Sequence, residues 1–168
     1  MDLIDTHAHL DEEAFTTDCA EVIARAVESG LKAVITIGTT ADSSRQAVEL
    51  ARQYPAVYAA VGIQPNYAAE AKPGDFQMIE QLAAQAKVVA IGETGLDRYW
   101  DFAPLDVQAE SFTRHIELSQ RLDLPLIVHC RDAEADVVSQ LQNTADRGPV
   151  RGVMHSFCGS LQTARACL

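Results

Sequence analysis

The sequence has no apolar run that approaches the roughly 20 residues needed to span a bilayer, so we expect no membrane partner. Its first residues, MDLIDTHAH, lack a basic segment ahead of an apolar one, which argues against a secretory signal. No C-x-x-C spacing relates its four cysteines, so we expect reduced thiols rather than a disulfide framework. Together these absences predict a cytoplasmic protein.

Positive charge is scarce, since 13 Lys and Arg face 24 Asp and Glu and the net charge is −11. Broad electrostatic capture of nucleic acid needs cationic side chains that displace counterions, so this composition disfavours it. It does not exclude an enzyme that holds phosphate through bound cations, because metal ions can be the largest local charges in a site. The 168 residues, 48% of them apolar, contain no linker or low-complexity tract, so we expect residues 1–168 to form a single domain.

Short β-rich runs alternate with longer helical stretches along the chain. We expect strands at 3–7, 33–38, 57–63, 87–92, 125–130 and 151–155. We expect helices at 16–29, 41–53, 75–86, 105–122, 133–144 and 159–168. Asp42 or Ser43 is the expected cap of the second helix, and Asp75 that of the third. The alternation is typical of right-handed βαβ units with a parallel sheet.

Six βα units fit either an open doubly wound sheet or three quarters of a TIM-type (β/α)8 barrel. A doubly wound sheet favours a Gly-rich loop after its first strand, where this chain has DTHAHLDEE. Residues two apart in a strand share a face, so Asp5, His7 and His9 should point together, and Ile91 should point with Glu93. Each series ends in a polar residue at the carboxyl end of its strand, where barrels gather their chemistry. We therefore expect an α/β fold of barrel type, with about six βα units present.

Side chains suited to metal binding end four of the apolar runs. They are His7, His9, Glu93, His129 and His155. Parallel strands bring their carboxyl ends to one edge, so these residues should converge there. Imidazole suits zinc or manganese, and a carboxylate extends the choice toward magnesium. Each residue alone has an ordinary explanation as a strand-end cap or a structural hydrogen-bonding group. Their shared position favours a metal centre and predicts a metal-dependent hydrolase.

Other polar residues just beyond the strand ends have two interpretations each. Arg131 suits bidentate binding of a phosphate or a salt bridge to Asp132 or Glu134. Asp5 suits the orientation of a metal-bound histidine or the capping of its strand. Asp97 suits contact with a substrate, although an exposed loop position is the commoner fate of such a residue.

The segments DTHAHLD, VGIQP, IGETGLDRYW, Q-x-x-x-F-x-x-H from Gln108 to His115, LPLIVHCRDA and GVMHSFCG together resemble the TatD-related deoxyribonucleases, barrel hydrolases allied to the amidohydrolases. The resemblance covers nearly the whole chain. It implies two divalent metal ions (Mg, Mn or Zn), one held by His7 and His9 and the other by His129 and His155. Glu93 would bridge both ions as the catalytic residue. DNA would be the substrate, with its phosphodiester bond cleaved by a metal-activated water.

The chain departs from the family pattern at two points. Gln64 in VGIQP stands where the family usually has a histidine near the scissile phosphate. Its amide can donate a hydrogen bond to a substrate but carries neither a labile proton nor a positive charge at neutral pH. We expect Gln64 and Arg131 to bind substrate. The last two βα units of the family, which supply a metal-binding aspartate, have no counterpart in these 168 residues.

A fragment, a truncated gene or a partner that completes the barrel would each explain this second departure. Unpaired strand edges would favour self-association, and loss of the aspartate predicts impaired nuclease activity. Two alternative functions remain. One is an amidohydrolase-like enzyme acting on a C–N or ester bond, although Lys32 and Lys87 are misplaced for the carboxylated lysine often seen there. The other is a truncated, non-catalytic metal-binding remnant.

Overall fold

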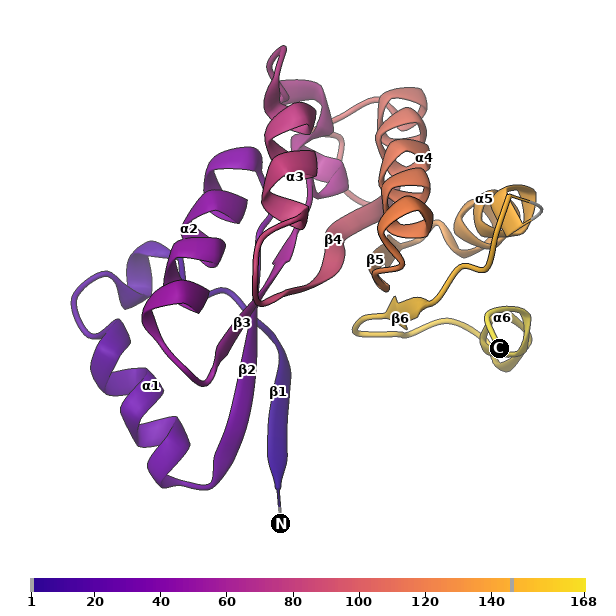
Figure 1. Ribbon diagram of the computed structural model, residues 1–168. Helices are drawn as coiled ribbons and strands as arrows, with labels where there is room; N and C mark the ends of the chain where they lie inside the picture. Colours follow the sequence, from indigo (N-terminus) through magenta and orange to yellow (C-terminus); the bar gives the residue numbers. More distant parts are fainter. Residues whose placement is uncertain (1, 146) are drawn as a thin grey trace.

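The computed structural model describes residues 2–145 and 147–168, which form a curled sheet flanked by helices (Figure 1). Its strands are β1 (Leu3–Ala8), β2 (Leu31–Ile37), β3 (Val57–Val61), β4 (Val88–Asp97), β5 (Leu126–Arg131) and β6 (Gly152–Met154). All neighbouring strands run parallel, in the order β1-β2-β3-β4-β5-β6. The predicted parallel sheet is confirmed, with shifted bounds for its strands.

Helices follow the strands in strict alternation. They are α1 (Cys19–Glu28), α2 (Ala41–Gln53), α3 (Asp75–Ala83), α4 (Leu105–Leu122), α5 (Glu134–Ala145) and α6 (Leu161–Ala166). Two 3₁₀ helices, η1 (Glu13–Phe15) and η2 (Pro65–Glu70), add to the predicted elements. The bounds predicted for α2 and α4 are confirmed. None of the described helices is both long and apolar enough to cross a membrane.

The predicted helix caps were wrong for α2 and α3. Thr40 caps α2, and its hydroxyl oxygen accepts a hydrogen bond from the Ser43 N–H at 3.1 Å. Gly74 precedes α3, with a left-handed backbone at φ +99°. Asp42, Ser43 and Asp75 instead lie in the first helical turn, where an acidic side chain still interacts favourably with the positive end of the helix dipole.

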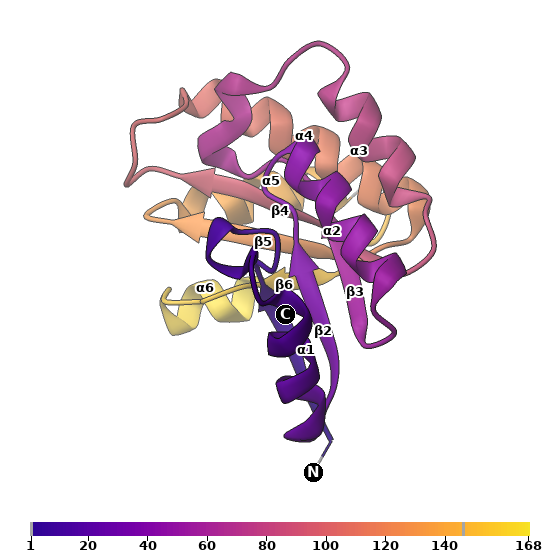
Figure 2. The same ribbon diagram turned by 90° about the vertical axis from the view of Figure 1, so that its left-hand side faces the viewer.

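The larger core cluster packs the helices onto the sheet. Phe112 and Ile116 of α4 are fully buried and belong to the same cluster as Ile91 of β4 and Leu126 of β5. Figures 1 and 2 show α2, α3 and α4 together on one side of the curled strands. This packing fixes β4 and β5, the two neighbouring strands that carry Glu93 and His129.

The sheet curls so that its two edge strands approach each other at their carboxyl ends. The imidazole of His7 in β1 stacks on that of His155, just after β6, with ring centroids 4.3 Å apart. A second, smaller apolar cluster comes from the strands alone and contains Ile37, Ala60 and Ile127. The expected barrel-type fold is therefore confirmed, as a curled half-barrel of six parallel strands.

One strand, β4, departs from regular alternation beside the site. Ile91 lies in the cluster that faces the helices, whereas Glu93 points toward the histidines. The register with β5 shifts between Ile91 and Thr94, and Gly92 between them has φ +144°. A Cβ at Gly92 would lie 2.6 Å from the Ile127 carbonyl oxygen. The prediction that Ile91 and Glu93 share a face was wrong, because this irregularity turns Glu93 to the opposite side.

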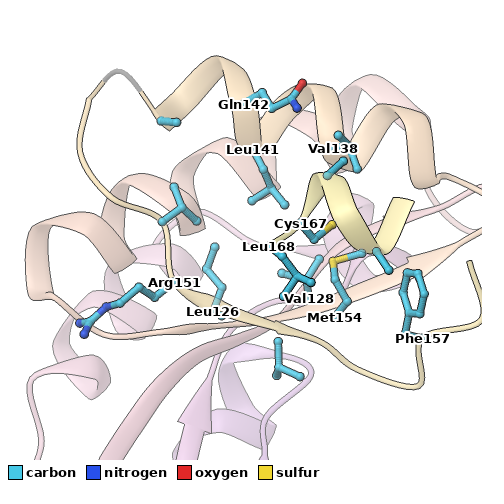
Figure 3. Close-up of a pocket in the computed structure, with 16 residues that line it drawn as sticks. Leu126, Val128, Val138, Leu141, Gln142, Arg151, Met154, Phe157, Cys167 and Leu168 are labelled. Carbon is cyan, nitrogen blue, oxygen red and sulfur yellow. The ribbon is translucent and has the colours of Figure 1, made fainter. Parts of the chain in front are cut away.

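An apolar cavity of about 450 Å³ lies between α5, β5, β6 and the segment around α6 (Figure 3). Figure 3 shows Val138 and Leu141 of α5 above Met154, Cys167 and Leu168. Within the described chain, none of the five predicted metal ligands lines this cavity. The cavity is therefore separate from the carboxyl edge where the predicted ligands lie.

The two edge strands carry exposed apolar side chains. Leu3 and Ile4 in β1 and Val153 in β6 are each about half exposed, at 48%, 59% and 51%. In the described chain β1 pairs only with β2, and β6 pairs only with β5. Self-association through these edges stays a prediction.

Candidate metal centre

The five predicted ligands meet at the carboxyl edge of the half-barrel. His7 lies in β1, Glu93 in β4 and His129 in β5. His9 and His155 directly follow β1 and β6. Because all the strands are parallel and the sheet curls, residues from both ends of the chain reach the same place.

The Glu93 carboxylate is the hub of this cluster, and its two oxygens face different histidines. Its Oε2 lies 3.2 Å from His7 Nε2 and 3.9 Å from His9 Nε2. Its Oε1 lies 2.9 Å from His129 Nδ1 and 3.3 Å from His155 Nε2. The side chain is nearly buried, at 4% exposure. One carboxylate therefore joins two pairs of imidazoles.

These contacts define two groups of possible metal ligands that share Glu93. One group contains His7, His9 and Glu93, and the other contains Glu93, His129 and His155. Within each group, one ligand atom from each residue lies within 4.8 Å of the others. Nitrogen and carboxylate donors at this spacing suit zinc or manganese, and the carboxylate also suits magnesium.

Electrostatics keep the hub anionic. Burial by itself would raise the pKa of Glu93, but interactions with His129, His155 and His7 outweigh it and hold the pKa well below its usual range. Burial by itself would lower the pKa of His129, but the Glu93 and Asp97 carboxylates outweigh it and raise the pKa. The cluster therefore places a fixed negative charge among nitrogen donors, which suits a divalent cation.

Two ring nitrogens in the cluster are not satisfied by protein groups. The Nδ1 atom of His7 and the Nε2 atom of His155 are buried and make no hydrogen bond within the described chain, although the latter lies 3.3 Å from Glu93. A buried polar atom without a partner costs free energy, on the order of 1–3 kcal/mol. A bound cation would supply a partner to a nitrogen of this kind, so the donor set fits a metal.

Asp97 supports the cluster, and sequence reasoning misplaced it. It ends β4, is 2% exposed, and its Oδ2 accepts hydrogen bonds from His129 Nε2 at 2.8 Å and Asn66 Nδ2 at 3.2 Å. The exposed loop position expected for it was wrong, because β4 continues beyond residue 92 and pairs Asp97 with Arg131 of β5. With Nε2 held by Asp97, the Nδ1 atom of His129 is left to face Glu93.

His9 is oriented by the backbone rather than by an acid. Its Nδ1 lies 3.0 Å from the Ile37 carbonyl oxygen, which leaves Nε2 to face Glu93. Such a contact between the second ring nitrogen and a carbonyl is typical of metal-binding histidines. Asp5 is exposed, and its carboxylate accepts the backbone N–H of His7 at 3.0 Å. Of its two predicted roles, the structure shows a contact with the strand backbone.

The two predicted substrate-binding residues lie on neighbouring segments. Gln64 is buried and precedes η2, where its Oε1 accepts the Asn66 N–H at 2.8 Å. Arg131 ends β5, is exposed, and has its guanidinium 4.4 Å from the centroid of the Tyr99 ring. Within the described chain Arg131 forms no ion pair, so the salt bridge considered for it is absent. Their role toward a substrate stays a prediction.

Sequence reasoning also missed how the Gln64 segment is held. His115 of α4 is fully buried, and its Nε2 accepts the Ile63 N–H at 3.0 Å. Its Nδ1 lies 2.7 Å from the Ser111 carbonyl oxygen. Burial lowers the pKa of His115 to about 4, so the ring is neutral at pH 7. Its place in the pattern Q-x-x-x-F-x-x-H was the only signal in the sequence.

Parallel βα units that curl into a half-barrel, with four imidazoles and a carboxylate at the carboxyl edge, define a barrel-type fold with a candidate metal centre. Comparison with protein families narrows this class. The family described as "TatD related DNase" matches residues 4–168, and the chain belongs to this family. The resemblance to the TatD-related deoxyribonucleases is thereby confirmed.

Similar proteins agree with this assignment. The chain is 42% identical over 166 residues to a Bacillus subtilis protein named "Uncharacterized metal-dependent hydrolase YabD", covering 99% of this chain and 65% of that protein. It is 32% identical to the "3'-5' ssDNA/RNA exonuclease TatD" of Escherichia coli K12, covering 99% of this chain and 64% of that protein. The chain thus spans slightly less than two thirds of the length of these relatives.

Solved structures show the same fold. The TatD homolog YJJV from Escherichia coli K12 superposes with a TM-score of 0.89 at 32% identity, covering 98% of this chain and 64% of that one. An uncharacterized amidohydrolase from Saccharomyces cerevisiae superposes with a TM-score of 0.82 at 19% identity, which shows likeness of fold alone.

Proposed function

We propose that this chain carries the metal centre of a hydrolase that cleaves phosphodiester bonds in DNA. In this proposal His7 and His9 would hold one divalent cation, His129 and His155 would hold a second, and Glu93 would be a ligand of both. Mg, Mn and Zn all suit these donors. The observation that carries the proposal is that the two carboxylate oxygens of Glu93 face different pairs of imidazoles.

When bound, divalent cations would supply positive charge for a phosphate group and would lower the pKa of the attacking water. The chain's own groups prepare this chemistry. Glu93 stays ionised at neutral pH because its imidazole neighbours hold its pKa low. Arg131 would bind a phosphate oxygen, and Gln64 would donate a hydrogen bond from its amide. Asp97 would keep His129 in the orientation that turns Nδ1 toward Glu93.

The level of activity is a separate part of the proposal. In the described chain, Glu93 is the only carboxylate that belongs to either ligand group. A carboxylate engaged with two cations is poorly placed to accept the proton of the attacking water as well. We therefore propose that the 168-residue protein binds metal but cleaves DNA weakly. We also propose that residues 1–168 form one domain, because the larger core cluster extends from Leu10 to Val137.

The amidohydrolase-like alternative lacks a supporting lysine in the described chain. The Lys87 ammonium donates to the carbonyl oxygens of Ala51 and Tyr54 at 2.5 and 2.6 Å, and burial lowers its pKa. Lys32 lies 3.8 Å from Asp2. Lys32 lies at the start of β2 and Lys87 directly precedes β4, so both lie at the opposite end of the strands from the two ligand groups.

Calorimetric titration of the 168-residue protein with MnCl2 or ZnCl2 tests the metal centre. Glu93→Gln keeps the side-chain volume and removes the charge from both ligand groups. We expect its affinity to fall by more than the roughly 100-fold known for supporting residues, because Glu93 itself is a ligand in this proposal. The matched control is Glu21→Gln, at an exposed position on α1, which should bind like the wild type.

Activity assays on the metal-loaded protein separate the candidate reactions. Labelled single-stranded DNA and a cyclic amide are offered in parallel. Slow DNA cleavage that disappears in Glu93→Gln supports the phosphodiester hydrolase. Turnover of the amide alone favours the amidohydrolase-like alternative, and metal binding without any turnover favours the non-catalytic remnant. Absence of metal binding by the wild type would overturn the proposed centre.

A further inference from the structure

An exposed aromatic surface lies beside the candidate metal centre. It consists of Tyr99, Trp100 and Phe102, which follow β4 and are 54%, 48% and 62% exposed. We call these three residues the aromatic loop. The chain has one Trp, four Tyr and five Phe. Three of these ten aromatic side chains are therefore exposed to solvent within four consecutive positions. Clustered exposure of this kind marks a binding surface more often than chance.

The rings of the aromatic loop are ordered against one another. Trp100 and Phe102 are stacked, with centroids 5.4 Å apart and planes 14° from parallel. Tyr99 meets Trp100 edge to face, at 4.8 Å and 87°. On the other side of the loop, the Arg131 guanidinium lies over the Tyr99 ring at 4.4 Å. The loop therefore presents flat apolar faces next to a cation.

One buried carboxylate connects the aromatic loop to the metal centre. The Oδ1 atom of Asp97 accepts the backbone N–H groups of Tyr99 and Trp100, each at 2.9 Å. Its Oδ2 atom accepts His129 Nε2 at 2.8 Å. The start of the loop and a predicted metal ligand are thus fixed by the same side chain. A ligand stacked on the loop would lie close to the two ligand groups.

We propose that the aromatic loop is a stacking site for an unpaired nucleobase next to the scissile phosphate. This inference rests on the proposed function, to which it adds a substrate-binding site. A nucleotide joins a flat apolar base to a phosphate, and here flat rings lie beside Arg131 and a candidate cation site. Stacking on aromatic side chains needs a free base face, so the site should favour unpaired over duplex DNA.

Positive charge near this site is limited. The protein carries a net charge of −11, and the neighbouring Arg98 is already paired with Asp136 at 2.7 Å. A binding mode that neutralises few phosphates releases few counterions, so its affinity depends weakly on salt. We therefore expect binding of an oligonucleotide to depend on its bases more than on ionic strength.

Trp100 is the only tryptophan of the chain, so its fluorescence reports on the proposed site directly. The experiment titrates a short oligothymidylate and an abasic oligomer of equal length and charge into the 168-residue protein. EDTA is present, so neither added metal nor cleavage contributes. We expect the oligothymidylate to quench Trp100 emission and the abasic oligomer to leave it unchanged. Equal responses to the two oligomers would overturn the inference.

Variants provide a second readout, the anisotropy of labelled oligothymidylate. Trp100→Leu should weaken its binding by about 5- to 150-fold, the range observed for loss of one base–aromatic stack. Trp100→Phe keeps a ring and should restore most of the affinity. Tyr67→Leu removes another exposed aromatic side chain, at 42% exposure, and should bind like the wild type. Unchanged affinity in Trp100→Leu would also overturn the proposed site.

The outcomes distinguish this inference from the proposed function. Base-dependent quenching without metal-dependent cleavage would leave the stacking site standing and count against the hydrolase. Metal-dependent cleavage without base-dependent quenching would support the hydrolase and overturn the stacking site. Dimers that dissociate in Trp100→Leu, without base-dependent binding, would assign the aromatic loop to a contact between copies and overturn the stacking site.

Discussion

Replacing Asp97 by Asn isolates the support that this carboxylate gives to His129. The two side chains have nearly the same volume, and one oxygen remains. That oxygen can still accept the Tyr99 and Trp100 N–H groups, each at 2.9 Å in the wild type. The second oxygen is replaced by the amide NH2 group, which is a donor and cannot accept the hydrogen bonds from His129 Nε2 and Asn66 Nδ2. The substitution therefore spares the loop and removes the contact with the imidazole.

The expected loss in metal affinity follows from the role of Asp97. Loss of a carboxylate that orients a metal-binding histidine typically costs 10- to 100-fold in affinity, or about 1.4 to 2.7 kcal/mol. We expect a loss of this size for the group that contains His129, and little change for the group that contains His7 and His9. Folding stability should fall by about 1–3 kcal/mol, because two buried donors lose their acceptor.

Calorimetric titration with ZnCl2 measures the affinities, and urea unfolding monitored by circular dichroism measures the stability. Asp106→Asn, at an exposed position in the first turn of α4, is the matched control and should leave both quantities unchanged. The reasoning would be refuted if Asp97→Asn bound metal at wild-type affinity in both groups. It would also fail if both groups weakened equally, because Asp97 contacts only one of them.

Two further predictions concern stability. Burial lowers the pKa of His115 from 6.5 to about 4, so the unfolded chain binds a proton at a higher pH than the folded chain does. The neutral ring therefore contributes its full stability above pH 6.5. This stability is lost as the pH falls toward 4, by about 3 kcal/mol in total. Urea unfolding at pH 7 and pH 4 should show this decrease in the wild type, and a decrease smaller by about that amount in His115→Gln. Phe112→Ala, at a fully buried position, should lower the free energy of unfolding by about 3–5 kcal/mol at pH 7, and a loss below about 1 kcal/mol would contradict the packing described for α4.

Much of the fold could be predicted because each βα unit has a local pattern. The helices at 41–53 and 105–122 have the predicted bounds, since long amphipathic stretches specify their own periodicity. The convergence of His7, His129 and His155 followed from the parallel direction of the strands, and the structure places these residues together. Their role as metal ligands stays a prediction.

What the sequence could not provide depends on contacts between distant segments. The length of β4 is set by its pairing with β5, so neither the turn at Gly92 nor the burial of Asp97 follows from local propensity. The same pairing brings Gly95 against β5, where an added Cβ would overlap the His129 carbonyl oxygen. The order within the aromatic loop likewise depends on hydrogen bonds to Asp97 that only the folded chain forms.

Because the two oxygens of Glu93 face different pairs of imidazoles, two cations bound as proposed would share one carboxylate and would affect each other's affinity. A cation on the His7 side would draw electron density from Glu93, which would weaken binding on the His129 side. The same cation would also fix the rotamer of Glu93, which would strengthen that binding. Thermodynamic linkage requires any such coupling to be reciprocal, so each ion would alter the affinity of the other by the same factor.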